Sequence, residues 1–176
     1  GLHNIQHGAD NESWLAPRQT FEGGWQGVHG LYPEGASMTS ISDRIIHFSI
    51  YYSLLVWDRI AGQFRNIPNS SSFLQTQLPA PYNSGSHYQY YVYDDTSNAD
   101  SFASDLNSLS SNSLVMITGN HEPQKNRFGT NNILLEAMKR CGAANAVFGS
   151  AGFKNQSAYI LIGIPGQGEG SGVEFY

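Results

Sequence analysis

A continuous apolar run, Ala158-Tyr-Ile-Leu-Ile-Gly-Ile164, most constrains what this chain can fold into. The run is short, and its β-branched and aromatic side chains favour a buried strand over a helix. It continues into a glycine-rich stretch, Pro165-Gly-Gln-Gly-Glu-Gly-Ser-Gly172. This stretch lacks the Lys-Ser/Thr pair of a phosphate-binding loop, and no helical pattern follows it. We therefore expect a turn with positive φ angles between two strands.

Composition favours a protein with an uncharged polar surface. The chain has 176 residues, enough for one domain or for one domain with a smaller module. Charged residues make up 13% of it, against a usual share of roughly 25%. Asn, Ser, Gln, Gly and Tyr take their place, which is typical of extracellular or virion proteins and of surfaces that recognise neutral polar ligands such as sugars.

Charge and apolar content argue against several classes of partner. The formal net charge is −5 and there are three lysines, so we expect no nucleic-acid partner. No apolar run approaches the length of a membrane span, and no signal-peptide pattern opens the chain. Because the first residue is Gly, we expect a fragment or a processed chain. Cys141 has no partner for an internal disulfide and is predicted to be a small core residue.

The chain divides into two regions by pattern. Residues 1–80 are predicted to form a β-rich N-terminal module, with a hairpin that turns at 58–62. The Pro- and Gly-containing segment 75–87 is the best candidate boundary. Beyond it we expect strands over 88–93, 114–118, 146–148, 158–164 and 173–176. One helix should open at Ser97 with a Ser97–Asp100 cap, and a second should run from about 130 to a terminating Gly142.

Catalytic and metal motifs are weak. Asp94, Asp95, Asp100 and Asp105 cluster at a helix start, where a pair of facing carboxylates would suit a glycan-cleaving enzyme. Acidic residues also stabilise helix N-termini, which explains the cluster without catalysis. Ser150 lacks the strand–turn–helix setting of a nucleophile elbow. We expect a non-enzymatic protein without cofactor.

The His121-Glu122 pair lacks the second histidine, four residues on, that a zincin requires, so we expect no metal. Aromatic residues in Gly- or Pro-rich segments, namely Trp14, Trp25, Tyr32, Tyr82 and Tyr88, are better candidates for binding. Flat rings beside amides are what sugars require, although packing against the protein's own loops is an alternative. We expect the ligand at Trp14, Trp25 and Tyr32, or on the loop of His121, Glu122 and Arg127.

Residues 88–176 resemble the interleukin-like EMT inducer (PANDER-like) domain. The resemblance rests on an ordered series: Tyr91-Val-Tyr93 leading into a helix, the strand at 112–118, the helix ending in Cys141-Gly142, and the closing segment 153–166. Secreted animal members carry disulfides and usually have Arg at the position of Lys154. These departures favour a bacterial or phage version.

The fold expected from the sequence and the resemblance is α+β: an antiparallel β-sandwich-like core with two helices, preceded by a β-rich module. The resemblance implies a receptor- or carbohydrate-binding module of a phage tail fibre or a similar adhesin. Its partner would be a host-surface glycan or receptor, its assembly a homotrimer, and its location the virion or the extracellular space. A glycan-cleaving enzyme and a structural trimerisation or connector unit are the alternatives.

Overall fold

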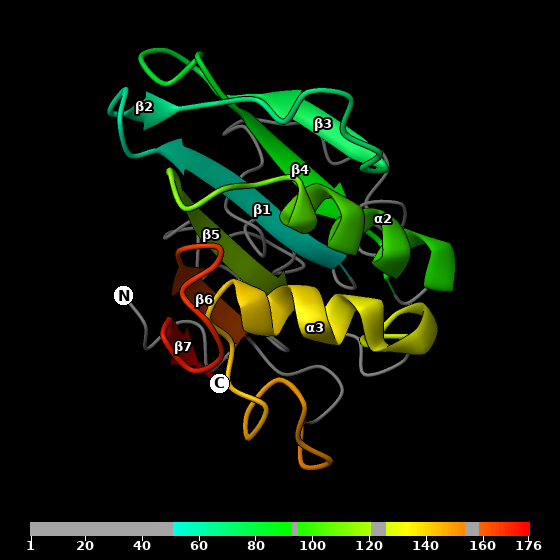
Figure 1. Ribbon diagram of the computed structural model, residues 1–176. Coiled ribbons are helices and arrows are strands. Elements are labelled where there is room, and N and C mark those ends of the chain that lie inside the picture. The colour runs from blue at the N-terminus through cyan, green and yellow to red at the C-terminus, as the bar shows by residue number, and fades with distance from the viewer. Residues whose placement is uncertain (1–50, 93–94, 121–125, 154–158) are drawn as a thin grey trace, which may run out of the picture.

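The computed structural model describes residues 51–92, 95–120, 126–153 and 159–176, and these residues form one antiparallel sheet with two helices (Figure 1). The sheet order is β3-β4-β1-β5-β6-β7, and β2 pairs with the end of β1. The strands are β1 (Tyr51–Asp58), β2 (Gln63–Phe64), β3 (Leu74–Gln77), β4 (Ser86–Tyr90), β5 (Ser113–Asn120), β6 (Tyr159–Gly163) and β7 (Val173–Phe175).

Two helices, α2 (Thr96–Asn107) and α3 (Ile133–Arg140), lie against the same face of the sheet (Figure 1). A short 3-10 turn, η2 (Thr130–Asn132), precedes α3. The predicted Ser97–Asp100 cap is wrong, because Asp95 caps α2 and accepts a hydrogen bond from the Ser97 N–H at 2.8 Å. Gly142 follows the C-cap of α3 at φ 108°, the position predicted for a terminating glycine.

The main core lies between the sheet and the helices, on what we call the helix face. Alternation along β1 places Tyr52, Leu54 and Val56 on this face, where all three are fully buried. The Phe102 ring of α2 stacks on the Tyr90 ring of β4, with centroids 4.2 Å apart. Cys141 belongs to the same cluster, as predicted, and burial raises the pKa of its thiol to about 12.

The opposite face of the sheet, the far face, has a different character. Near β1 and β4 it buries polar side chains, among them Ser53 and His87. Toward the other edge it carries apolar side chains that reach solvent: Ile162, Val173 and Phe175. Neither α2 nor α3 covers this face (Figure 1).

The α+β class is confirmed, as are the antiparallel sheet and the two helices. The described residues form a single sheet, so they do not show the two-layer character of a sandwich. The predicted hairpin is present as β1 and β2, where the Asp58 carboxylate accepts from the N–H groups of Ile60 and Ala61. Residues 146–148 form a turn rather than a strand, because the Phe148 N–H donates to the Ala144 carbonyl.

Strands from both sides of the expected domain boundary belong to this sheet. β1 pairs with β4 and with β5 along its length, although β1 lies within 1–80 and both partners follow residue 85. The Pro-rich segment between β3 and β4 is therefore a connection inside one sheet. Residues 1–50 of the expected N-terminal module lie outside the described residues. Within the described ranges, no helix is both long and apolar enough to span a membrane.

Candidate functional site

Of the predicted ligand-binding residues, the structure describes Arg127. Trp14, Trp25, Tyr32, His121 and Glu122 lie outside the described residues. Arg127 is 6% exposed; its Nε donates to the Phe148 carbonyl at 3.1 Å and its Nη2 to the Ser150 carbonyl at 2.6 Å. The guanidinium also lies over the rings of Phe128 and Phe153. Arg127 thus fastens the loop around residues 148–153, and a direct contact with ligand stays a prediction.

Each described residue of the acidic cluster accepts a hydrogen bond from another residue of the fold. Asp95 caps α2, and Asp100 accepts from the Thr130 N–H at 2.7 Å and from its hydroxyl at 2.6 Å. Asp105 is buried and accepts from the hydroxyls of Tyr90 and Ser70, both at 2.6 Å. Asp94 lies outside the described residues. These three carboxylates do not face one another across a cleft, so the geometry gives the glycan-cleaving alternative no support.

The Ser150 side chain is also engaged within its own turn, because its Oγ accepts from the Gly152 N–H at 3.0 Å. The glycine-rich stretch is a turn from β6 to β7, as predicted, with positive φ at Gly166, Gly168 and Gly170. Since a strand rather than a helix follows it, the loop has no helix N-terminus to hold a phosphate.

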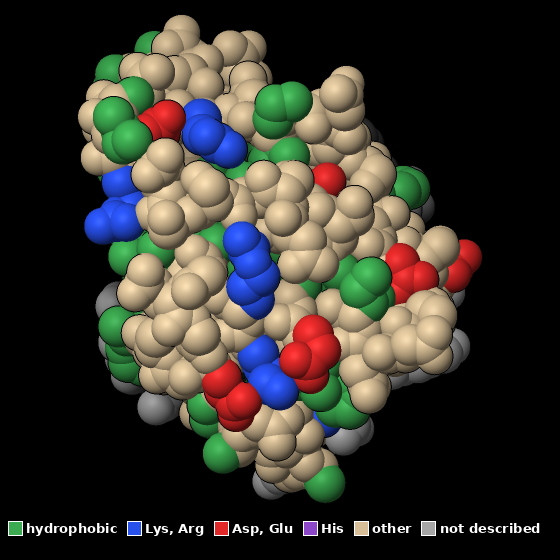
Figure 2. Space-filling view, in the orientation of Figure 1, with side chains coloured by type: hydrophobic (Ala, Val, Ile, Leu, Met, Phe, Trp, Pro, Cys, Tyr) green, Lys and Arg blue, Asp and Glu red, His purple; other side chains and the backbone are tan. Residues whose placement is uncertain are grey.

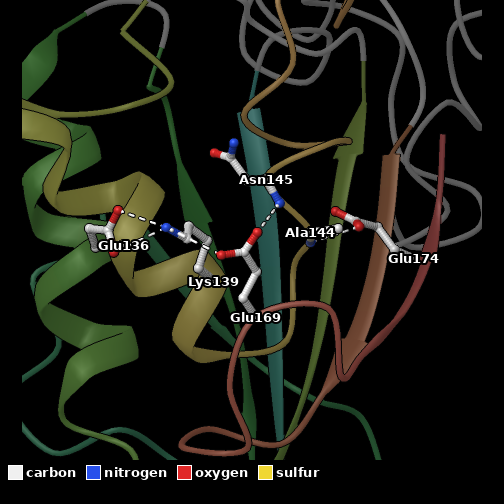
Figure 3. A network of polar contacts seen from close by, with 6 residues as sticks. All are labelled: Glu136, Lys139, Ala144, Asn145, Glu169 and Glu174. Atoms are coloured by element: carbon white, nitrogen blue, oxygen red, sulfur yellow. Dashed lines mark hydrogen bonds and ion pairs between the residues drawn. The ribbon is translucent and has the colours of Figure 1, made fainter.

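A polar network attaches this glycine-rich loop to α3 (Figure 3). The Glu169 carboxylate accepts from the Asn145 N–H at 3.0 Å and lies 3.4 Å from the Lys139 ammonium, which also contacts Glu136 at 3.1 Å. The Asn145 N–H and the Lys139 charge together lower the pKa of Glu169. Beside it, the Glu174 carboxylate of β7 accepts from the Ala144 N–H at 3.0 Å.

A pocket of about 310 Å³ lies between this loop and the far face of the sheet. Its apolar wall includes Leu114, Ile162 and Val173, and its polar groups are the side chains of Gln167 and Ser171. No charged side chain lines it among the described residues. The volume is at the lower end of the range for small-molecule sites, so the pocket suits a small uncharged ligand or group.

A cluster of three aromatic rings forms a second candidate surface. The Trp57, Phe64 and Tyr82 rings meet edge to face, with centroids 5.0 Å apart for Trp57–Phe64 and 5.6 Å for Phe64–Tyr82. Trp57 and Phe64 are partly buried, whereas Tyr82 is 53% exposed. An edge-to-face arrangement leaves one face of the outermost ring free of its neighbour. We call Trp57, Phe64 and Tyr82 the aromatic corner.

Backbone hydrogen bonds and a close contact with Phe64 hold the loop that carries Tyr82. The Tyr82 N–H donates to the Pro79 carbonyl at 2.8 Å, and the Gly85 N–H donates to the Tyr82 carbonyl at 3.1 Å. A Cβ at Gly85 would lie 2.5 Å from the Phe64 Cβ, so only glycine allows this close approach. The Gln77 side-chain amide donates to the backbone carbonyl of Asn83 at 3.0 Å, which connects β3 to the same loop.

Sequence reasoning treated Tyr82 and Tyr88 alike, and the structure separates them. Tyr88 is fully buried on the helix face, and its hydroxyl oxygen accepts from the Ile67 N–H at 2.6 Å. Tyr82 is the exposed member of the pair. The signal that distinguishes them is position: Tyr88 alternates with other inward residues of β4, whereas Tyr82 falls between two prolines and a glycine.

A buried Ser53–His87 pair was missed. Ser53 Oγ lies 2.7 Å from His87 Nε2 on the far face, and the two residues are 4% and 5% exposed. Burial lowers the pKa of His87 to about 4, so the imidazole is neutral at pH 7. Neither side chain reaches solvent, and the pair is therefore read as structural. The one sequence signal for this pair is Ser53, a polar residue among the apolar residues of β1.

The described residues contain no group of three His, Cys, Asp or Glu side chains placed to hold a metal ion. The surface over the helices carries scattered charges among uncharged atoms, without a basic stripe on this side (Figure 2). Comparisons of the chain with protein-family models, with curated proteins and with solved structures find no match. The resemblance to interleukin-like EMT inducer domains therefore stays a prediction.

Proposed function

We propose that this chain is a non-enzymatic binding module for a neutral polar ligand, with carbohydrate as the ligand class. The setting that we propose is a phage tail fibre or similar extracellular adhesin, with a host-surface glycan or receptor as partner. The single observation that supports the carbohydrate class most is Tyr82, a half-exposed ring on a loop held by backbone hydrogen bonds and by the Gln77 side-chain amide, which donates to the Asn83 backbone carbonyl. Rings of this kind stack on the apolar faces of sugars, and amides bond their hydroxyls.

Two further observations support a binding role over catalysis. The carboxylates of Asp95, Asp100 and Asp105 are already bonded within the fold. The surface is poor in charge, as the 13% share of charged residues requires. A neutral ligand loses little by leaving water for such a surface, whereas a charged ligand would need a partner of opposite sign.

The test is a glycan array probed with the whole chain, followed by binding titrations with Tyr82→Ala. We expect Tyr82→Ala to weaken binding about tenfold, the equivalent of a ring contact of about 1.4 kcal/mol. Tyr176→Ala is the matched control, because that ring is 54% exposed and lies on a different part of the surface. Loss of affinity in both variants, or in neither, would contradict a site at the aromatic corner.

The predicted tryptophans are tested in the same titrations. If Trp14→Ala and Trp25→Ala abolish binding while Tyr82→Ala leaves it unchanged, the ligand lies at the N-terminal aromatic residues. An array without any bound glycan, together with unchanged adsorption by those variants, would overturn the carbohydrate class.

A further inference from the structure

Strand β3 is an edge strand that lacks most of the usual protection against pairing. It stands first in the sheet order, and all four of its residues, Leu74–Gln77, are exposed. Natural edges are commonly protected by charged side chains, by proline within the strand, by a bulge or by a covering segment. Its pairing with β4 is regular from Leu74↔Gln89 to Gln77↔Ser86, so no bulge interrupts it. Within the described ranges, short length is the one protective device of this strand.

The segment around β3 is also free of charge. No Asp, Glu, Lys, Arg or His occurs between Pro68 and Ser86. Two copies of this segment therefore meet without repulsion between like charges, which is destabilising when such residues lie directly opposite.

The direction of the backbone groups along β3 follows from one hydrogen bond. The Leu78 N–H donates to the Gly85 carbonyl at 3.0 Å, so Leu78 faces β4. Backbone groups alternate in direction along a strand, and those of Gln75 and Gln77 therefore point away from β4. No strand among the described residues pairs with this outer edge.

We propose that two copies of this chain pair through their β3 edges, antiparallel and about a two-fold axis at Thr76. In this register the outward backbone groups of Gln75 form hydrogen bonds with those of Gln77 of the second copy. Those of Gln77 pair in the same way with Gln75 of the second copy. Thr76 then lies opposite Thr76 of the second copy as a non-hydrogen-bonded pair, where side chains approach most closely. Threonine pairs across strands are stabilising.

The flanking residues are complementary in the same register. Leu74 faces Leu78 of the second copy, and Phe73 faces Pro79 of the second copy. The Phe73 ring is 64% exposed in the single chain, although its edge contacts Tyr91 with centroids 4.7 Å apart. Pro79 has no N–H to donate, so the ladder ends there. An interface of this length is small, and we expect a weak, concentration-dependent dimer.

This assembly differs from the trimer expected from the sequence, because an isologous two-fold contact closes as a dimer. The proposed dimer does not depend on the proposed carbohydrate ligand. The pairing also places two aromatic corners in one particle, which would raise the avidity for a multivalent surface without any change at either site.

Sedimentation velocity over a range of concentrations, up to about 1 mM, tests the proposal. We expect the whole chain to pass from monomer to dimer. Thr76→Lys and Thr76→Glu should each weaken dimerisation at least about tenfold, because like charges would face each other at the axis. An equimolar mixture of the two variants should recover the dimer, since an ammonium of one variant would then face a carboxylate of the other.

The mixing step separates a lost contact from a damaged fold, because two misfolded variants would not restore association. Gln63→Lys, an exposed substitution on β2, is the control and should leave the dimer unchanged. A monomer at every concentration would overturn the proposal. So would a trimer, a dimer unaffected by charge at position 76, or a mixture that stays monomeric.

Discussion

The helix face and the far face of the sheet bury different kinds of groups. On the helix face the rings of Tyr52, Tyr90 and Phe102 pack together, and the buried carboxylate of Asp105 accepts hydrogen bonds from two hydroxyls. On the far face the buried pair is neutral, and apolar side chains such as Val173 reach solvent. Stability should therefore depend mainly on the helix face, and the far face should add a dependence on pH.

The largest expected effect comes from the centre of the helix face. Phe102→Ala removes a fully buried ring that stacks on Tyr90, and we expect a loss of about 3–5 kcal/mol in the free energy of unfolding. Urea denaturation measures it. Phe175→Ala is the matched truncation on the far face; that ring is partly exposed, and we expect a loss below about 1.5 kcal/mol. Equal losses would show that the two faces contribute alike.

The second effect is acid destabilisation from the far face. The folded state holds the pKa of His87 near 4, against an ordinary value of 6.5, because burial disfavours the charged imidazole. Between these values the unfolded state binds a proton that the folded state does not. Stability should therefore fall as pH decreases from about 6.5 to about 4, by roughly 3 kcal/mol in total, and this contribution should level off below that range.

The measurement compares the wild-type chain with His87→Gln, whose amide retains a hydrogen-bonding group beside Ser53. The variant should lose the histidine part of the pH dependence, so the difference between the two stability curves isolates it. A direct check is the titration of the His87 ring by NMR. A midpoint near 6.5 would mean that the ring is solvated and that the far face does not bury it.

Elements that depend on local signals were predictable, and elements that depend on distant contacts were not. Helix α3 follows from the apolar spacing between Leu134 and Met138, and its end follows from Gly142. These residues lie in the helix or directly after it. The central position of β1 depends on pairing with strands about 30 to 70 residues away, as in Tyr52↔Gly119. Local composition cannot encode such a pairing, so the segment 75–87 is a candidate boundary by composition although it connects strands of one sheet.

The same distinction applies to the candidate site. Of the acidic residues expected at a helix start, Asp95 caps α2, but Asp100 lies in the middle of the helix and Asp105 near its C-terminal end. The donors that engage Asp105 come from Ser70 and Tyr90, outside the helix. Tyr82 became a candidate through its place between Pro81 and Gly85. The contact of its ring with Phe64, and the close approach of Gly85 to Phe64, leave no signal in the local sequence.

The third effect is a smaller loss from the polar centre of the helix face. Asp105→Ala leaves the buried Tyr90 hydroxyl and the Ser70 hydroxyl without their acceptor, and we expect a loss of about 2 kcal/mol, typical of bonds to a charged group. Asp105→Asn retains one acceptor oxygen, and its loss should be smaller. Thermal or urea unfolding at pH 7 measures both. If alanine is no worse than asparagine, the two hydroxyls find other acceptors.

The smallest expected effect is at the exposed apolar edge of the far face. Val173 is 55% exposed, so Val173→Ser removes little buried surface and should change the free energy of unfolding by no more than about 0.5 kcal/mol. Urea denaturation of the dilute chain is the measurement, and Leu54→Ser on the helix face of β1 is the contrasting variant. A loss of about 2 kcal/mol or more at Val173 would mean that this edge is covered in solution. The two faces would then both be cores, and the distinction drawn between them would fail.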